Sequence, residues 1–274
     1  MGELHKHLEK IVFLYGKDSF VYIPNELFVK LSSIHESNVI QTSFMYAYTV
    51  TTSFLYQYTV YVDFNDMSYL QNGDIKVGLG YSRKNKTVDA IIKKGGILDI
   101  EGITRTLAKE KVPLYFEVDY SDKIHNTPIY EPFYREELSW AKDDFYKVVK
   151  NKNYTAKEPM FLFHPFGDRD SGTFYNKENT HVITVHELLS LIQGDFDNVD
   201  LMIYFYIKSK CKGFQGDRRG LQLSIILKDL NISESAYYDH LKKLKDKKII
   251  MTFPNGFDED GNRKKTDYQW KSIC

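Results

Sequence analysis

The feature that most constrains this fold is a short turn between two stretches of helical periodicity near the C-terminus. Leu221 to Leu230 places apolar residues on one helical face, and Asn231-Ile232-Ser233 follows as a tight turn. Ser233 is a favoured N-cap residue and predicts a helix that runs to Lys247. Two helices joined by so short a turn must cross at a steep angle over a shared core.

The flanking segments extend this pattern into a module. Leu201 to Lys210 predicts a helix before the pair, and Met251-Thr252-Phe253 predicts a strand after it. Residues 255–262 are rich in Gly, Asp and Asn, as hairpin tips are, and Thr266 to Trp270 predicts the returning strand. The sequence therefore predicts a C-terminal domain, residues 199–274, in which three helices precede an antiparallel hairpin.

The helix from Ser233 has an apolar face and a polar face. Tyr237, Leu241 and Leu244 share the apolar face, and Ile249-Ile250 follows it. The polar face is predicted to carry Glu234, Ser235, Tyr238, Asp239, Lys242 and Lys243. Any surface helix has such a face, so the basic flank of the hairpin is more informative. Its residues Arg263, Lys264 and Lys265 favour nucleic acid, because cations on a hairpin can contact phosphate.

These residues carry a family resemblance. Leu230 to Ser233, then Tyr237, Leu241, Leu244 and Lys248-Ile249-Ile250, resembles the winged helix-turn-helix pattern of bacterial transcription regulators. The resemblance implies that the helix from Ser233 reads the major groove and that the hairpin is the wing. Glu234 and Asp239 depart from the usual pattern. They can accept hydrogen bonds from cytosine, but they repel phosphate.

A weaker copy of the pattern occurs near the N-terminus. Residues 74–82 can form a helix and turn, and Arg83 to Lys94 a second recognition helix with Val88, Ile91 and Ile92 in its core. Gly95 to Leu98 then resembles the exit into a wing that carries Arg105. The predicted DNA contacts of this second winged helix are Arg83, Lys84, Asn85, Lys86, Lys93, Lys94 and Arg105. The alternative is a small helical core element with a solvated basic face.

Two winged helices in one chain resemble the replication initiators of plasmids and phages. The resemblance implies a homodimer or monomer that binds double-stranded DNA on a mobile element. A repressor, or another transcription factor with an oligomerising domain, fits the same pattern. Regulation of transcription and of DNA replication therefore both remain open.

Charge supports a local phosphate-binding surface. The chain has no net charge, yet residues 1–116 sum to +1, residues 117–200 to −7 and residues 201–274 to +6. We predict an N-terminal domain (1–118), an acidic connecting region (119–198) and the C-terminal domain. The acidic region suggests an alternative function, in which a protein partner binds there and the winged helices are docking surfaces.

The remaining segments predict an α+β fold that is mainly helical. The predicted elements are a strand at Phe20–Pro24, a helix Glu26–Leu31 capped by Asn25, a buried helix Asn38–Val62, a loop with Pro128 and Pro132, a helix Glu136–Val149, a strand Met160–Phe163, a turn at Gly167–Gly172, and a helix Val185–Ile192 capped by Thr184 with Glu187 and ended by Gly194.

Several classes of protein are disfavoured. Cys211 and Cys274 are too few for a disulfide framework or a multi-cysteine zinc site, which favours a reducing, cytoplasmic location. We find no secretory signal, no uninterrupted apolar span for a membrane, and no phosphate-binding Gly-rich ATPase motif. His164, Asp168 and Asp170 suit a turn better than a cation site. No nucleophile, base and acid have convincing spacing, so we expect no enzyme, no cofactor and no metal.

Overall fold

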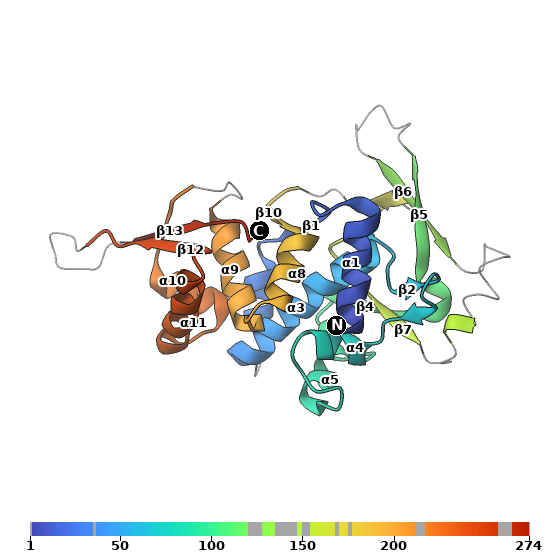
Figure 1. The fold of residues 1–274 in the computed structure, drawn as a ribbon, viewed down its shortest axis with the longest axis horizontal. Coiled ribbons are helices and arrows are strands. Elements are labelled where there is room, and N and C mark those ends of the chain that lie inside the picture. Colours follow the sequence, from blue (N-terminus) through green and yellow to red (C-terminus); the bar gives the residue numbers. More distant parts are fainter. Residues whose placement is uncertain are drawn as a thin grey trace. The chain divides into compact units, whose positions relative to one another are not determined.

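The computed structural model describes residues 2–34, 37–119, 128–134, 147–149, 154–167, 170–174, 177–211, 217–256 and 265–273. It is mixed α/β, with 45% helix and 23% strand in small antiparallel sheets, which agrees with the predicted α+β class. The chain divides into two compact units (Figure 1). Unit 1 comprises Met1–Tyr22 and Tyr48–Lys177, and unit 2 comprises Ile23–Ala47 and Glu178–Cys274.

This division differs from the boundaries predicted at residues 118 and 198. Residues 178–198 group with the C-terminal region because Glu187 is bonded to the helix that follows. Lys208 Nζ lies 2.5 Å from Glu187 Oε1, and the Tyr204 hydroxyl donates to the same oxygen at 3.3 Å. Glu187 and Lys208 are both buried, and a buried charge is tolerated where it is paired.

Among the described residues, unit 1 contains short helices and three separate sheets, the smallest of which pairs β2 with β3. Its elements are α1 (Glu3–Tyr15), β2 (Val62–Asp63), β3 (Ser68–Tyr69), α4 (Asn72–Gly78), α5 (Lys86–Ile92), α6 (Ile97–Ile100), β4 (Thr104–Ala108), a 3-10 turn (Lys109–Lys111), β5 (Pro113–Asp119), β6 (Ile129–Tyr134), β7 (Thr155–Pro159), β8 (His164–Pro165) and β9 (Gly172–Thr173). Strand β4 pairs with β7, and β5-β6-β9-β8 form a four-stranded sheet. Two elements cross the unit boundary, β1 (Phe20–Pro24) and α3 (Val39–Gln57).

Two predictions for unit 1 are wrong. Pro132, assigned to a loop, lies in β6 opposite Phe116 of β5, where tertiary pairing overrides its local preference. The predicted strand Met160–Phe163 is a turn between β7 and β8, closed by the Leu162 amide donating to the Pro159 carbonyl at 3.1 Å. The predicted helix Glu136–Val149 lies almost entirely outside the described residues.

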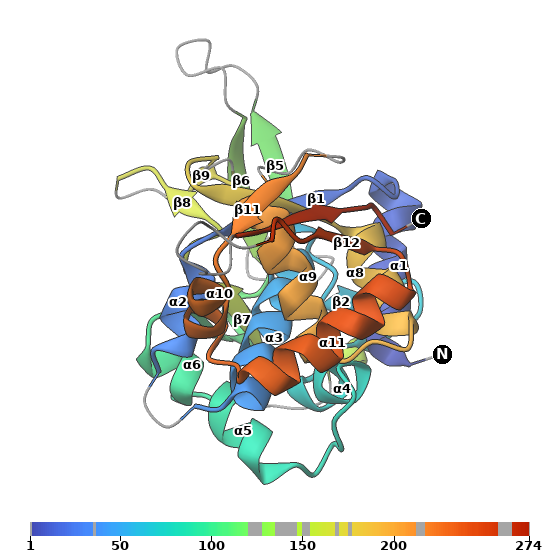
Figure 2. The ribbon, with the colours of Figure 1, turned by 90° about the vertical axis from the view of Figure 1, so that its left-hand side faces the viewer.

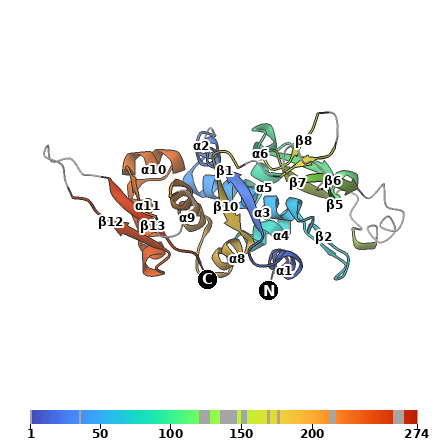
Figure 3. The same cartoon turned by 90° about the horizontal axis from the view of Figure 1, so that it is seen from above.

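Unit 2 consists of helices and a three-stranded sheet. Its elements are α2 (Leu27–Ser32), β10 (Thr180–Thr184), α8 (Val185–Gln193), α9 (Asn198–Lys210), β11 (Arg219–Leu221), α10 (Leu223–Leu230), α11 (Glu234–Asp246), β12 (Ile250–Phe253) and β13 (Thr266–Trp270). The sheet has the order β11-β13-β12, and both pairings are antiparallel. Figure 2 shows α10 and α11 following one another along the chain, and Figure 3 shows β12 and β13 side by side.

An aromatic cluster forms the centre of the unit 2 core. The Phe28 ring stacks on Tyr46 at 4.6 Å and contacts Tyr206 edge-on at 5.2 Å. The hydroxyl of Tyr46 lies 2.9 Å from His181 Nε2, and complete burial lowers the pKa of His181 to about 3. The imidazole is therefore neutral, with one ring nitrogen donating and the other accepting.

The helix predictions outside the C-terminal module were mostly confirmed. Helix α3 is buried over most of its length, as predicted, although it ends at Gln57 rather than Val62. Thr184 and Glu187 cap α8 reciprocally, and Gly194 ends it. Asn25 does not cap α2, because its side chain bonds instead to Asn179 and His181. Within the described ranges, no helix has the length and apolar character to cross a membrane.

Candidate nucleic-acid interface

The turn between α10 and α11 fixes the start of α11. Asn231 adopts a left-handed conformation (φ 50°, ψ 48°), which Asn tolerates better than most residues, and it ends α10. The Ser233 hydroxyl accepts from the Ala236 amide at 3.3 Å and caps α11. Tyr237, Leu241 and Leu244 are buried, so one face of α11 is committed to the core.

The opposite face of α11 is exposed over its first half and middle. The exposed residues there are Ser233, Glu234, Ser235, Tyr238, Asp239 and Lys242. Side chains at positions 235, 238, 239 and 242 share one helical face, because residues three and four apart are neighbours on a helix. This face can approach a partner without disturbing the core.

Lys243 was assigned to the same face, and that assignment is wrong. Its ammonium lies 2.7 Å from Asp200 Oδ2 and 5.6 Å from the centroid of the Phe196 ring. Asp200 is fully buried at the start of α9, so Lys243 serves to hold α11 against α9. Lys243 lies three residues after His240, so these two side chains are neighbours on the side of α11 that meets α9.

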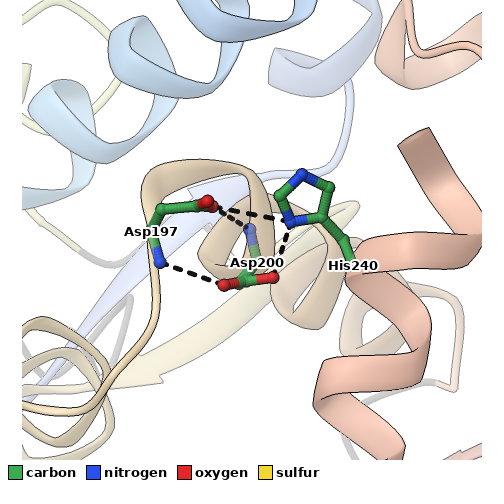
Figure 4. Close-up of side chains that lie close together, drawn as sticks. All are labelled: Asp197, Asp200 and His240. Carbon is green, nitrogen blue, oxygen red and sulfur yellow. Dashed lines mark hydrogen bonds and ion pairs between the residues drawn. The ribbon is translucent and has the colours of Figure 1, made fainter.

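His240 also points toward α9 (Figure 4). Its Nδ1 lies 2.7 Å from Asp200 Oδ1 and 3.7 Å from Asp197 Oδ1. Both carboxylates belong to the start of α9, so His240 pairs with a neighbouring helix and not with an acidic residue of α11. The hydrogen bond to Asp200 raises the pKa of His240 above its usual value, despite the opposing effect of burial.

Asp200 is ionised although it is buried. Burial alone would raise its pKa, but hydrogen bonds from His240 and Lys243 outweigh burial and lower it. The pKa of Lys243 is raised, because its bond to Asp200 outweighs its own desolvation. The Lys243 ammonium and the His240 imidazole, whose pKa is raised, therefore face one buried carboxylate of α9, an arrangement that we call the α9–α11 clamp.

Asp197, Asp200 and His240 are also groups that could hold a metal ion. Their oxygens already have partners, however. Asp197 Oδ1 accepts from the amides of Val199 and Asp200, and Asp200 Oδ2 accepts from the Asp197 amide and Lys243. The ammonium of Lys243 and the N-terminus of α9 provide the positive charge that a cation would supply.

The hairpin strands β12 and β13 present further cations. Lys265, just before β13, is exposed, and its carbonyl accepts from Asn255 Nδ2 at 2.8 Å across the hairpin. Arg263 and Lys264 lie outside the described residues. Sequence reasoning missed Arg218 and Arg219, which enter the sheet through β11, and Arg218 lies 3.7 Å above the centroid of the Phe253 ring. The adjacent arginines were the available signal, but their strand could not be assigned without its partner β13.

The basic residues predicted in unit 1 lie around α4 and α5. Helix α5 is shorter than predicted, because Asn85 caps it by accepting from the Val88 amide at 3.1 Å. Arg83, Lys84 and Asn85 therefore precede the helix. The Arg83 guanidinium is paired with Asp74 of α4, whereas Lys84, Lys86, Lys93 and Lys94 are exposed.

The exit into a wing predicted at Gly95–Leu98 is wrong. Ile97 instead begins α6, and the strand β4 that follows pairs with β7, far along the chain. Arg105 of β4 bonds to Glu158 of β7, with Nη2 2.5 Å from Oε2. The element predicted as a local hairpin is thus a long-range pairing that sequence periodicity could not detect.

No protein-family model, curated protein or solved structure matches this chain.

The interface must therefore be judged on its geometry. Its two parts, the exposed face of α11 with the β11-β13-β12 sheet and the basic surface around α5, lie in different units.

Proposed function

We propose that residues 198–273 form a winged helix that binds double-stranded DNA. The observation that carries the proposal is the order of the elements. Helix α9, strand β11, helices α10 and α11, and strands β12 and β13 follow one another, and the strands make the sheet β11-β13-β12. A capped, half-exposed helix after a three-residue turn is the arrangement that helix-turn-helix proteins place in the major groove.

In this proposal α11 contacts the bases of the DNA, and the sheet contacts its backbone. Ser235, Tyr238 and Asp239 lie on the exposed face of α11 and would meet base edges, whereas Lys242 would meet phosphate. Lys265, Arg219 of β11 and the preceding Arg218 would contact the DNA backbone on the sheet side. Glu234 and Asp239 favour cytosine-containing sites, because a carboxylate can accept from the cytosine amino group.

The basic surface of unit 1 is proposed as a second DNA contact. It comprises Lys84, Lys86, Lys93 and Lys94, which are exposed and have no ionic partner among the described residues. Two contacts in one chain would suit control of transcription or of replication initiation on a phage or plasmid, in the cytoplasm, with the chain acting as a homodimer or a monomer. The spacing of half-sites in the bound DNA would distinguish these states.

The first experiment selects bound sequences from a random and genomic duplex library at moderate salt. We expect one repeated or palindromic sequence to be enriched. Tandem repeats beside an origin would indicate an initiator, and a palindrome over a promoter a repressor. An intact, folded protein that enriches no sequence would contradict the proposal of specific duplex binding.

Charge reversal tests the surface itself. We expect K242E/K265E to weaken duplex binding by roughly tenfold or more. We also expect its salt dependence to fall, because a protein that contacts fewer phosphates releases fewer counterions from DNA on binding. The matched control is K30E, which reverses an exposed lysine of α2 in the same unit outside the module. Equal losses in the two variants would contradict α11 and the wing as the binding surface.

One observation favours a second function. The exposed face of α11 carries Glu234 and Asp239 beside Tyr238, and Ile225 of α10 is half exposed, which also suits a protein partner. Binding through a partly apolar protein interface should respond little to salt. Binding through about 5 to 8 phosphates should fall by orders of magnitude between low and moderate salt.

A further inference from the structure

Unit 1 contains a cavity of about 690 Å³ beside α6 and β4. Its lining residues are Lys94, Gly95, Asp99, Gly102, Thr104, Arg105, Thr106 and Met160. A volume of this size is typical of sites for small molecules or for parts of larger ligands. The cavity is wide open to solvent, and Lys94 on its lining is exposed.

Asp99, one of the lining residues, forms an ion pair with the buried Lys157. Lys157 Nζ, at 1% exposure, lies 2.6 Å from Asp99 Oδ1 and donates to Thr106 Oγ1 at 2.7 Å. The hydroxyls of Thr104 and Thr106 donate to the two Asp99 oxygens at 2.7 and 2.5 Å. The Asp99 carboxylate is thus neutralised and saturated from within the protein.

The exposed charges of the cavity are positive. Arg105 donates through Nε and Nη2 to Glu158 Oε2. A guanidinium has five N–H groups, so these two bonds use only part of its donors. The Arg105 side chain is 60% exposed and the Glu158 side chain 7%, so the cation faces solvent while its carboxylate partner lies behind it. Lys94 adds an exposed ammonium group as the second cation.

Two glycines of the lining lie in turns, and their amides donate to Asp99, from Gly95 to Oδ2 at 3.0 Å and from Gly102 to the carbonyl at 3.2 Å. Gly95 (φ +65°) and Gly102 (φ +62°) both have left-handed conformations, and a Cβ added at either would meet no atom within 4 Å. Their positions border empty space, and no side chain at either one blocks the approach of a ligand.

We propose that this cavity binds a phosphate group, with the Arg105 guanidinium and the Lys94 ammonium as its cationic contacts. A partly engaged guanidinium and an ammonium on the lining of one pocket match the charge and the multiple acceptors of phosphate. The phosphate belongs either to the backbone of duplex DNA or to a small phosphate-bearing molecule such as a nucleotide. The site does not depend on DNA binding by α11, which lies in the other unit.

The test is a titration of the full chain with inorganic pyrophosphate at low ionic strength. Binding is monitored through the amide NMR signals of Gly95 and Gly102. Saturable shifts of both signals are expected. K94Q should weaken the affinity roughly fivefold, the upper range for one exposed ion pair. R105Q/E158Q removes the guanidinium without leaving a buried carboxylate unpaired, keeps an acceptor for the Tyr56 hydroxyl, and should weaken affinity at least as much.

The control K17Q removes an exposed lysine of unit 1 outside the cavity and should leave the affinity unchanged. Glycine signals that do not move, or equal losses in K17Q and K94Q, would overturn the proposal. A short duplex added to K242E/K265E then identifies the source of the phosphate. Shifts of the same glycines with duplex indicate a backbone phosphate, and shifts with pyrophosphate alone indicate a small ligand.

The duplex is added to the K242E/K265E variant, so DNA binding by α11 and phosphate binding by the cavity are tested independently. Loss of specific duplex binding by α11 leaves the pyrophosphate shifts intact, whereas a cavity without phosphate affinity leaves the α11 measurements unaffected.

Discussion

At the scale of single residues, the clamp between α9 and α11 is held by charge. His240 and Lys243 both contact Asp200, which has no exposed surface, and Asp197 lies beside them. A buried carboxylate is costly without partners, and removal of one partner leaves part of that cost uncompensated. The packing of α11 against α9 therefore depends on the ionisation of His240, Lys243 and Asp200.

This linkage predicts a pH-dependent effect of H240N. The pKa of His240 is raised in the folded protein, so its stabilisation is complete below the unfolded value of 6.5 and is lost as pH rises through the folded pKa. The pKa of Asp200 is lowered, so its contribution is present above 3.8 and is lost as pH falls through its folded pKa. We expect the difference in unfolding free energy between the wild type and H240N to be largest between pH 4 and 6.5.

Urea denaturation at several pH values measures that difference. Comparing the two proteins removes the contribution of His181, whose lowered pKa destabilises the wild type in acid. A difference that is the same at pH 6 and pH 9 would contradict an ionised His240 in the clamp.

At the scale of elements, the start of α11 depends on its cap. The hydroxyl of Ser233 satisfies the Ala236 amide, one of the donors that a helix N-terminus leaves unpaired. We expect S233A to lower the free energy of unfolding by about 1 kcal/mol and S233D to retain most of it, because Asp is also an effective N-cap. Chemical denaturation of the three proteins makes the comparison, and equal stability of S233A and S233D would contradict the capping role.

At the scale of the whole molecule, unit 2 is assembled from two distant segments. Phe28 of the first segment packs on Tyr206 of α9, and Asn231 Nδ2, at the turn before α11, donates to the Ser37 carbonyl at 2.8 Å. The C-terminal region therefore shares its core with residues 23–47. A large apolar surface left uncovered usually leads to aggregation or loss of cooperative folding.

A fragment of residues 199–274 should therefore fold poorly by itself. We expect it to bind a hydrophobic dye and to unfold without a sharp transition, because its side of the aromatic cluster would be exposed. A chain that joins residues 23–47 to residues 178–274 through a flexible linker should unfold cooperatively. Thermal unfolding followed by circular dichroism compares them. Cooperative unfolding of the shorter fragment would contradict a shared core.

The local elements of this protein follow from short-range signals in its sequence. Caps and helical periodicity predicted α8 almost to the residue, and the turn at Asn231 with Ser233 placed α10 and α11. These features depend on residues within one or two turns of each other, so they are visible in a single chain segment.

Contacts between distant residues became visible only once the chain was folded. The partners of His240 and Lys243, the pairing of β4 with β7, and the core shared by residues 23–47 with the C-terminal region join positions far apart in the chain. A side chain's spacing along a helix says which face it occupies, but not what packs against that face. The physical reason is that burial and ion pairing are set by the whole fold, whereas capping and periodicity are set by neighbours in sequence.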